Sequence, residues 1–124
     1  MADNAAVIRD FMSAWSRLDA AELADYFTED GVYHNIPVGP VAGKDAVRKF
    51  IADFSASWTE TAWDIRTLIA DGDRVVCERT DRTKTTRGDV DLPCVGVFEM
   101  RDGRIAVWRD YFDLATFMKA MQAE

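Results

Sequence analysis

The chain has 124 residues, a length typical of one domain with its own hydrophobic core, and we expect a single domain over 1–124. Hydrophobic residues make up 48% of it and charged residues 30%, which excludes an intrinsically disordered protein. The formal net charge of −7, with no basic cluster, argues against nucleic acid or an anionic membrane surface as the main partner.

Helical periodicity dominates the first half of the chain. Residues 4–17 predict a helix because apolar side chains recur at three- and four-residue spacing. A shorter helix is expected at 19–27 and a third at 44–56. Between them, the turn-rich stretch EDGVYHNIPVGP predicts one short extended piece over 32–36, which Pro37 and Pro40 are expected to end.

The second half has the two-residue periodicity of β-strands, followed by a closing helix. Two of the links, ADGD and RDGR, contain Asp-Gly, the strongest short hairpin signal. A helix is expected at 113–121, capped by Asp113, with inward-facing side chains at Leu114, Phe117, Met118 and Met121. The sequence therefore predicts an α+β fold, in which a curved, mainly antiparallel sheet wraps around helices and leaves an apolar pocket. The four expected strands are 61–70, 74–85, 92–100 and 104–112.

Two of these strands place charged residues on an otherwise apolar face. Alternation puts Arg79 and Asp81 on the apolar side of 74–85, and Asp110 on the apolar side of 104–112. Burying an ionised carboxylate is costly unless it is paired, so we expect Asp110 to pair with Arg79 and Asp81. A purely structural salt bridge, or a strand edge where all three groups reach water, explains the same pattern and stays open.

A third polar pair lies in the short extended piece. Tyr33 and Asn35 share one face, and Val32, His34 and Ile36 share the other. Apolarity alone favours the second face as the inner one, so alternation does not decide which pair points inward. A loop hydrogen bond is the structural alternative for Tyr33 and Asn35.

Other kinds of site have little support in the sequence. Cys77 and Cys94 are the only cysteines and have no metal or redox spacing, so both are expected to be small buried hydrophobic residues. With a single histidine, His34, a histidine-based metal site is improbable. The start MADNAAVIRD has no signal-peptide character, and no segment reaches the length of a membrane span, so a cytoplasmic location is expected.

The three polar pairs also carry a resemblance. Tyr-x-Asn at 33 and 35, Arg-x-Asp at 79 and 81 and Trp-x-Asp at 108 and 110 together resemble the limonene-1,2-epoxide hydrolase family. The stretch GVFEMRDGRIAVWRDYFD is similar to that family's final hairpin. The resemblance implies the cone-shaped α+β fold shared with ketosteroid isomerases, polyketide cyclases and nuclear transport factor 2, a fold that hosts many functions.

The family implies a role for each of these residues. Asp110 would be the base that activates a water molecule held by Tyr33 and Asn35. Asp81 would be the acid that protonates the epoxide oxygen, and Arg79 would bridge the two carboxylates. The reaction would need neither a metal nor an organic cofactor, and Trp108 would support the pocket beside Asp110.

The substrate implied is a hydrophobic epoxide, such as a cyclic or terpene-like one, which reacts with water to give a vicinal diol. The residues expected in the pocket wall, besides Trp108, are Met12, Trp15, Leu92, Phe112 and Phe117. Family members are usually homodimers through the outer sheet face, and the residues expected to suit that contact are Val76, Ile105 and Val107.

Two other functions fit the same fold. A ketosteroid isomerase-like or polyketide cyclase-like enzyme needs one base and an oxyanion donor, and has no need of an arginine between two carboxylates. A non-catalytic small-molecule-binding domain would use Arg79, Asp81 and Asp110 only to stabilise the fold.

Overall fold

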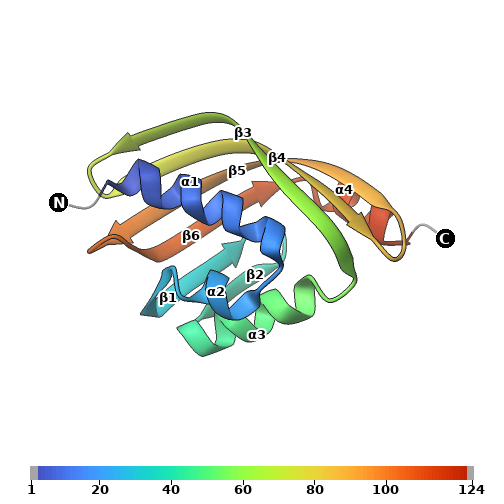
Figure 1. The fold of residues 1–124 in the computed structure, drawn as a ribbon, viewed down its shortest axis with the longest axis horizontal. Helices are drawn as coiled ribbons and strands as arrows, with labels where there is room; N and C mark the ends of the chain where they lie inside the picture. Colours follow the sequence, from blue (N-terminus) through green and yellow to red (C-terminus); the bar gives the residue numbers. More distant parts are fainter. Residues whose placement is uncertain (1–2, 123–124) are drawn as a thin grey trace.

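The computed structural model describes residues 3–122, with side chains as far as Lys119. It is an α+β fold in which helices lie along one curved sheet (Figure 1). The helices are α1 (Asn4–Ala14), the short 3₁₀ helix η1 (Trp15–Arg17), α2 (Ala20–Ala24), α3 (Lys44–Phe54) and α4 (Leu114–Gln122). The strands are β1 (Phe27–Asn35), β2 (Gly39–Ala42), β3 (Trp58–Asp71), β4 (Arg74–Thr85), β5 (Asp89–Arg101) and β6 (Arg104–Phe112).

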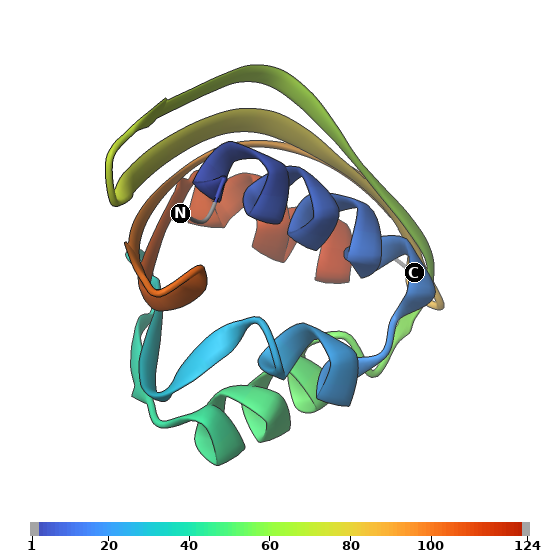
Figure 2. The ribbon, with the colours of Figure 1, turned by 60° about the vertical axis from the view of Figure 1, so that its left-hand side comes forward.

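The six strands form one sheet in the order β2-β1-β6-β5-β4-β3. All neighbouring strands are antiparallel except β1 and β6, which run parallel. Figure 2 shows the long strands arching over α1, while α2 and α3 lie at the opposite side of the molecule. The predicted curved, mainly antiparallel sheet around N-terminal helices is confirmed.

The predicted helix starts agree with capping by acidic side chains. The carboxylates of Asp3 and Asp19 accept hydrogen bonds from the amides of Ala6 and Glu22, each at 3.1 Å, where α1 and α2 begin. Both hairpin predictions also hold, because β3–β4 and β5–β6 turn at the two Asp-Gly sites. At the second of these, Asp102 and Gly103 both have positive φ, as expected of a tight hairpin turn.

The predicted extended piece at 32–36 was too short. Strand β1 begins at Phe27, and β2 was not expected at all. Pro40 lies within β2, opposite His34. Because β2 is an edge strand, a residue without an amide hydrogen is tolerated there.

The prediction that Ile105 lies on the outer sheet face was wrong. The pairing of β5 with β6 shifts between Glu99 and Met100, so that Glu99 faces Val107 and Met100 faces Ile105. Ala106 is therefore an extra residue in β6, and it reverses the inward–outward alternation for the residues that precede it. Ile105 consequently points into the core, where it is fully buried.

Helix α4 lies at the end of the long strands, far from the N-terminus in Figure 1. Asp113 caps it, since its carboxylate accepts hydrogen bonds from the amide and the hydroxyl of Thr116. Leu114 and Phe117 are half-buried as expected, but Met118 is exposed. The side chain of Met121, also expected inward, lies outside the described residues.

Candidate active site

The three charged residues singled out in the sequence form one hydrogen-bonded cluster. The Arg79 guanidinium donates to Asp81 through Nε (2.8 Å) and Nη2 (3.1 Å). It donates to Asp110 through Nη1 (2.8 Å) and Nη2 (2.7 Å). Two edges of one planar cation therefore hold two carboxylates, a geometry that lysine cannot provide.

The sheet register brings these residues together. Arg79 and Asp81 point inward from β4, and Asp110 points inward from β6, with β5 between them. The β5 residue opposite Asp110 is Gly96. A Cβ atom on Gly96 would lie 3.2 Å from Arg79 Nη1 and 2.8 Å from Trp108 Nε1, so glycine is what lets the arginine side chain cross this strand.

The cluster is removed from water. Arg79 has no exposed surface, and Asp81 and Asp110 are 6% and 3% exposed. Burial raises the pKa of Asp81 from its ordinary 3.8 to about 6, against the opposing effect of Arg79 and with a further increase from the Asp110 charge. Asp81 is therefore the carboxyl that holds a proton more readily than usual.

Tyr33 and Asn35 lie on the inner face, which alternation left undecided. Parallel pairing of β1 with β6 sets Asn35 opposite Asp110 and Tyr33 opposite Trp108. The rings of Tyr33 and Trp108 stack at 4.2 Å. Burial raises the pKa of the Tyr33 hydroxyl well above its ordinary value, so it remains a protonated donor.

The side chain of Asn35 has no hydrogen-bond partner within residues 3–122. Both its amide nitrogen and its amide oxygen are buried and unbonded. A buried amide in this state favours a polar ligand or a water molecule at the same place. Since Asn35 and Asp110 both line the same cavity, that ligand would lie close to a carboxylate.

This cavity is apolar and tight. The centres of water molecules can occupy about 20 Å³ of it. That is enough for about one water molecule. Its polar wall residues are Tyr33, Asn35, Asp81, Thr83 and Asp110.

Half of the expected wall residues line the cavity. Leu92, Phe112 and Phe117 do so. Met12, Trp15 and Trp108 do not, so their prediction as wall residues was wrong: each is at most 1% exposed and packs in the main core. Periodicity identified them as inward-facing, but it cannot separate the part of an inner face that meets a cavity from the part that meets a helix.

The sequence analysis missed five wall residues. Phe54 comes from α3, Trp58 and Trp63 from β3, Thr83 from β4 and Val90 from β5. Trp63 lies opposite Asp81 in the β3–β4 register, and Val90 lies opposite Thr83. Two-residue alternation in β3 puts Thr61 and Trp63 on the same face, and this pattern was the signal that could have identified Trp63.

Both cysteines are buried, free thiols. Burial raises the pKa of Cys77 to about 11 and raises that of Cys94 as well, so neither is an activated nucleophile. Cys94 Sγ lies 3.5 Å from Asp81 Oδ2 and contributes a weak hydrogen bond to the cluster. Among residues 3–122, no three His, Cys, Asp or Glu side chains are placed to hold a metal ion.

Comparison with known proteins identifies the family. Residues 8–108 match the SnoaL-like domain family. The chain is also 44% identical over 114 residues to epoxide hydrolase EphG of Mycobacterium tuberculosis, covering 92% of this chain and 76% of that protein. The chain belongs to the SnoaL-like family. The resemblance to limonene-1,2-epoxide hydrolases is likewise confirmed.

Solved structures of SnoaL-like and related proteins share the fold. An M. tuberculosis LEH-like epoxide hydrolase superposes with a TM-score of 0.81 at 28% identity, covering 94% of this chain and 87% of that one. A Catenulispora acidiphila protein with a ketosteroid isomerase-like fold superposes with a TM-score of 0.85 at 18% identity, covering 95% and 93%. The second likeness shows the fold alone. No helix within residues 3–122 is long and apolar enough to cross a membrane.

Proposed function

We propose that this SnoaL-like protein is an epoxide hydrolase, which adds water to a hydrophobic epoxide and releases a vicinal diol. The observation that carries the proposal is the Asp81–Arg79–Asp110 cluster, buried and facing an apolar cavity. The relative at 44% identity that is named as an epoxide hydrolase supports the same chemistry. We propose that residues 1–124 form one domain of this kind.

The reaction needs an acid and a base at the same time. Asp81, with its pKa raised to about 6, holds the proton and donates it to the epoxide oxygen as the carbon–oxygen bond breaks. Asp110 is ionised and accepts a proton from the water molecule as the water oxygen attacks the epoxide carbon. Afterwards Asp81 is ionised and Asp110 protonated, and one proton passes back through water to restore the starting state.

Arg79 and the two β1 residues support this step. Arg79 stays charged throughout. Its positive charge balances the ionised Asp110 before the proton transfers and the ionised Asp81 after them. The unbonded amide of Asn35 and the hydroxyl of Tyr33 hold the attacking water beside Asp110. The attack is by water itself, without a covalent ester between Asp110 and the substrate.

The cavity favours a hydrophobic substrate. Its wall is largely aromatic and aliphatic, which suits cyclic or terpene-like epoxides, limonene epoxide among them. A cytoplasmic location remains a prediction from the sequence.

The test is turnover of a panel of terminal and cyclic epoxides in ¹⁸O-labelled water, followed as diol by mass spectrometry. In a single turnover, with enzyme in excess, label should enter the diol, because water attacks directly. Diol that carries unlabelled oxygen from a carboxylate would overturn direct attack. Isomerisation of a β,γ-unsaturated ketone with no diol from any epoxide would instead support the isomerase function.

We also propose a homodimer through the outer sheet face. Val76, Val95 and Tyr111 are between 37% and 44% exposed on three adjacent strands. Val95 lies directly opposite Tyr111 on that face. An apolar surface of this kind on the outer face of a sheet is typical of a contact between subunits.

A further inference from the structure

We infer that Trp58 and Thr83 form a second polar subsite in the cavity, and that this subsite binds a hydroxyl group which the epoxide carries away from its oxirane ring. The preferred substrates are therefore hydroxylated hydrophobic epoxides. An epoxide without the hydroxyl, such as limonene epoxide, still binds but lacks this contact. The inference rests on the proposed function and names the substrate class of the same site.

Trp58 supplies an unused hydrogen-bond donor. It lies at the start of β3, is half-buried and lines the cavity. Its indole Nε1–H is itself buried and has no acceptor among residues 3–122. An unbonded buried N–H is costly, so this donor favours an acceptor that a ligand or a water molecule supplies.

Thr83, which is 4% exposed and also lines the cavity, supplies an unused acceptor. Its Oγ1 atom is 2.7 Å from Thr61 Oγ1, which also accepts from Trp63 Nε1 at 3.0 Å and can donate to the Arg82 carbonyl oxygen at 3.3 Å. Every proton in this network has an acceptor when Thr83 donates to Thr61. The Thr83 oxygen then accepts no hydrogen bond from the residues that the structure describes, so it is free to accept one from a ligand.

The two side chains lie at the same end of the cavity. In the β3–β4 register Trp58 pairs with Thr85, which makes it a diagonal neighbour of Thr83. Diagonal neighbours are about 7–8 Å apart, close enough for one small group to bridge them. A hydroxyl can accept from the indole and donate to Thr83, whereas a carbonyl or ether oxygen can only accept.

This subsite is separate from the groups that hold the attacking water. Thr83 lies two residues beyond Asp81 on the inner face of β4, about 7 Å along the strand. Asn35, on β1, is separated from β4 by β5 and β6. When the oxirane oxygen accepts the Asp81 proton, a hydroxyl farther along the same substrate can therefore reach Thr83.

The subsite also lies mainly on the side of the cavity that the sheet holds in place. The opposite wall includes Phe54 of α3 and Phe117 of α4, two half-buried rings that stack at 5.3 Å. Because these rings come from separate helices, they can part to admit a substrate without moving β4. The spacing between Asp81 and Thr83 is then the same with the cavity open or closed.

The matched pair of substrates is cyclohexene oxide and 3,4-epoxycyclohexanol. The hydroxyl of the second lies on the same ring face as the oxirane oxygen, because Asp81 and Thr83 project from the same face of β4. We expect a wild-type ratio of kcat/KM, hydroxylated over unsubstituted, of at least about 10. Dividing by the ratio for acid-catalysed hydrolysis in water removes the effect of the hydroxyl on the intrinsic reactivity.

Two variants each remove one hydrogen bond to the substrate hydroxyl. Thr83→Val keeps the size of the side chain without its hydroxyl, and Trp58→Phe keeps an aromatic ring without its N–H. Each should lower the ratio by about 5-fold. Thr83→Ser, which keeps the hydroxyl, should keep the ratio. We expect Thr83→Val to fold, since Thr61 retains both Trp63 Nε1 and the Arg82 carbonyl as partners.

The chain offers a control for each substitution. Thr80→Val makes the same change at a buried threonine of β4 that does not line the cavity. Trp15→Phe removes an indole N–H that is also buried and unbonded among the described residues, but Trp15 does not line the cavity. Both controls should leave the ratio at the wild-type value. Because each ratio is measured within one variant, it does not depend on the fraction of protein that is folded.

A wild-type preference for cyclohexene oxide, or a ratio that either Thr83→Val or Trp58→Phe leaves unchanged, would overturn the inference while leaving epoxide hydrolysis intact. If the wild-type protein makes no diol from any epoxide, the proposed function fails. In that case calorimetric binding of the two unreacted epoxides still decides whether the subsite exists. Tighter binding of the hydroxylated epoxide, lost in Thr83→Val, supports it, and equal binding contradicts it.

Discussion

Asp81 and Asp110 bind two edges of the same guanidinium, and burial there raises the pKa of Asp81 to about 6. The two carboxylates come from strands separated by β5 and lie in one water-excluding cluster. In the proposed mechanism, which needs an acid and a base together, the raised pKa of Asp81 suits it to donate the proton, and Asp110, which lines the cavity with Asn35, takes the role of the base.

Replacing either carboxylate should stop the reaction while the protein stays folded. General acid or base catalysis contributes roughly 10²- to 10⁴-fold, so Asp81→Asn and Asp110→Asn should each lower kcat by at least about 100-fold. The measurement is diol formation from an epoxide that the wild-type protein hydrolyses. Asp91→Asn, which changes an exposed carboxylate on the same sheet, is the control and should keep full activity. Turnover at the wild-type rate in either cluster variant would rule out the mechanism.

Removing Arg79 should cost stability as well as activity. Arg79→Met leaves two buried carboxylates without their cation, and breaking a buried pair in this way costs about 3–5 kcal/mol. The free energy of unfolding is measured by urea titration at pH 7.

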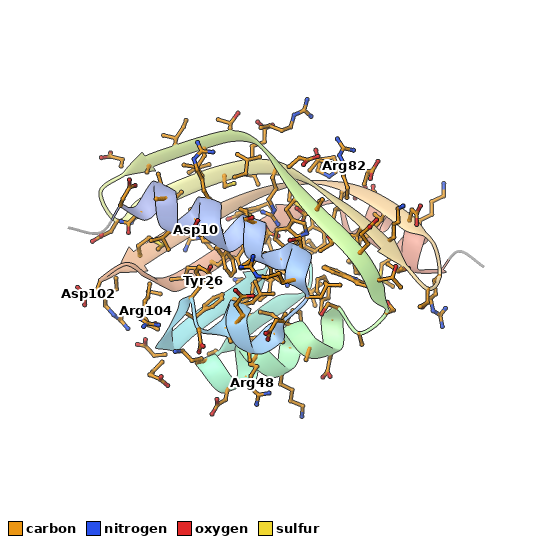
Figure 3. The ribbon with its side chains drawn as sticks, viewed as in Figure 1. Asp10, Tyr26, Arg48, Arg82, Asp102 and Arg104 are labelled. Carbon is orange, nitrogen blue, oxygen red and sulfur yellow. The ribbon has the colours of Figure 1, made fainter. Side chains whose placement is uncertain are left out.

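Arg82 provides the matched control for Arg79. It lies three residues along β4 and points away from the interior (Figure 3), where it pairs with Asp64 at 2.7 Å in an exposed salt bridge. Arg82→Met should change the free energy of unfolding by no more than about 0.5–1 kcal/mol. Similar losses in the two variants would show that burial of the cluster contributes little.

The acid should also give the enzyme a pH dependence. Because Asp81 must be protonated, kcat/KM should fall as the pH rises through about 6. Since the pKa of Asp81 is higher in the folded state than its ordinary 3.8, its contribution to stability is fully present below 3.8 and is lost as the pH rises through about 6. The loss is about 3 kcal/mol at 1.36 kcal/mol per pKa unit.

Comparing the free energy of unfolding of the wild-type protein with that of Asp81→Asn separates the contribution of Asp81 from the contributions of the other carboxylates. The difference in unfolding free energy, wild type minus variant, should decrease between pH 4 and pH 7. A difference that does not vary over this range would mean that the pKa of Asp81 is not raised.

Gly96 should tolerate no side chain. In Gly96→Ala the new Cβ atom would lie 2.8 Å from Trp108 Nε1, so the indole and the Arg79 guanidinium must shift. Overpacking of this kind costs about 1–3 kcal/mol, and a displaced arginine should lower kcat by about 100-fold. Val97→Ile, which enlarges the next, half-buried residue of β5, is the control and should have little effect on kcat. Normal kcat in Gly96→Ala would show that Arg79 does not need this path.

The proposed dimer is tested on the outer face of the sheet. Light scattering at micromolar concentration should give twice the mass of the chain for the wild-type protein. Val95→Glu, which places a charge opposite Tyr111, should give a monomer with unchanged turnover. A wild-type monomer would refute the dimer.

The helices, the four long strands and the charged cluster were predictable from the sequence, whereas β2 was not. Three- and four-residue spacing gave the helices, and two-residue alternation put Arg79, Asp81 and Asp110 on inner faces. The cost of burying a carboxylate then required a partner, and the structure provides it at 2.7–3.1 Å. Local periodicity and charge were sufficient here because each of these strands is long and regular.

The tertiary structure decided the features that depend on the register between neighbouring strands. The bulge at Ala106 turned Ile105 inward, and the parallel pairing with β6 turned Tyr33 and Asn35 toward Asp110. Periodicity within one strand contains no information about the neighbouring strand, so alternation gave neither outcome, and only the family resemblance implied the inward position of Tyr33 and Asn35. Periodicity also does not show which part of an inner face meets the cavity, and for that reason Trp15 was mistaken for pocket wall, while Trp63, its stacking partner, was missed.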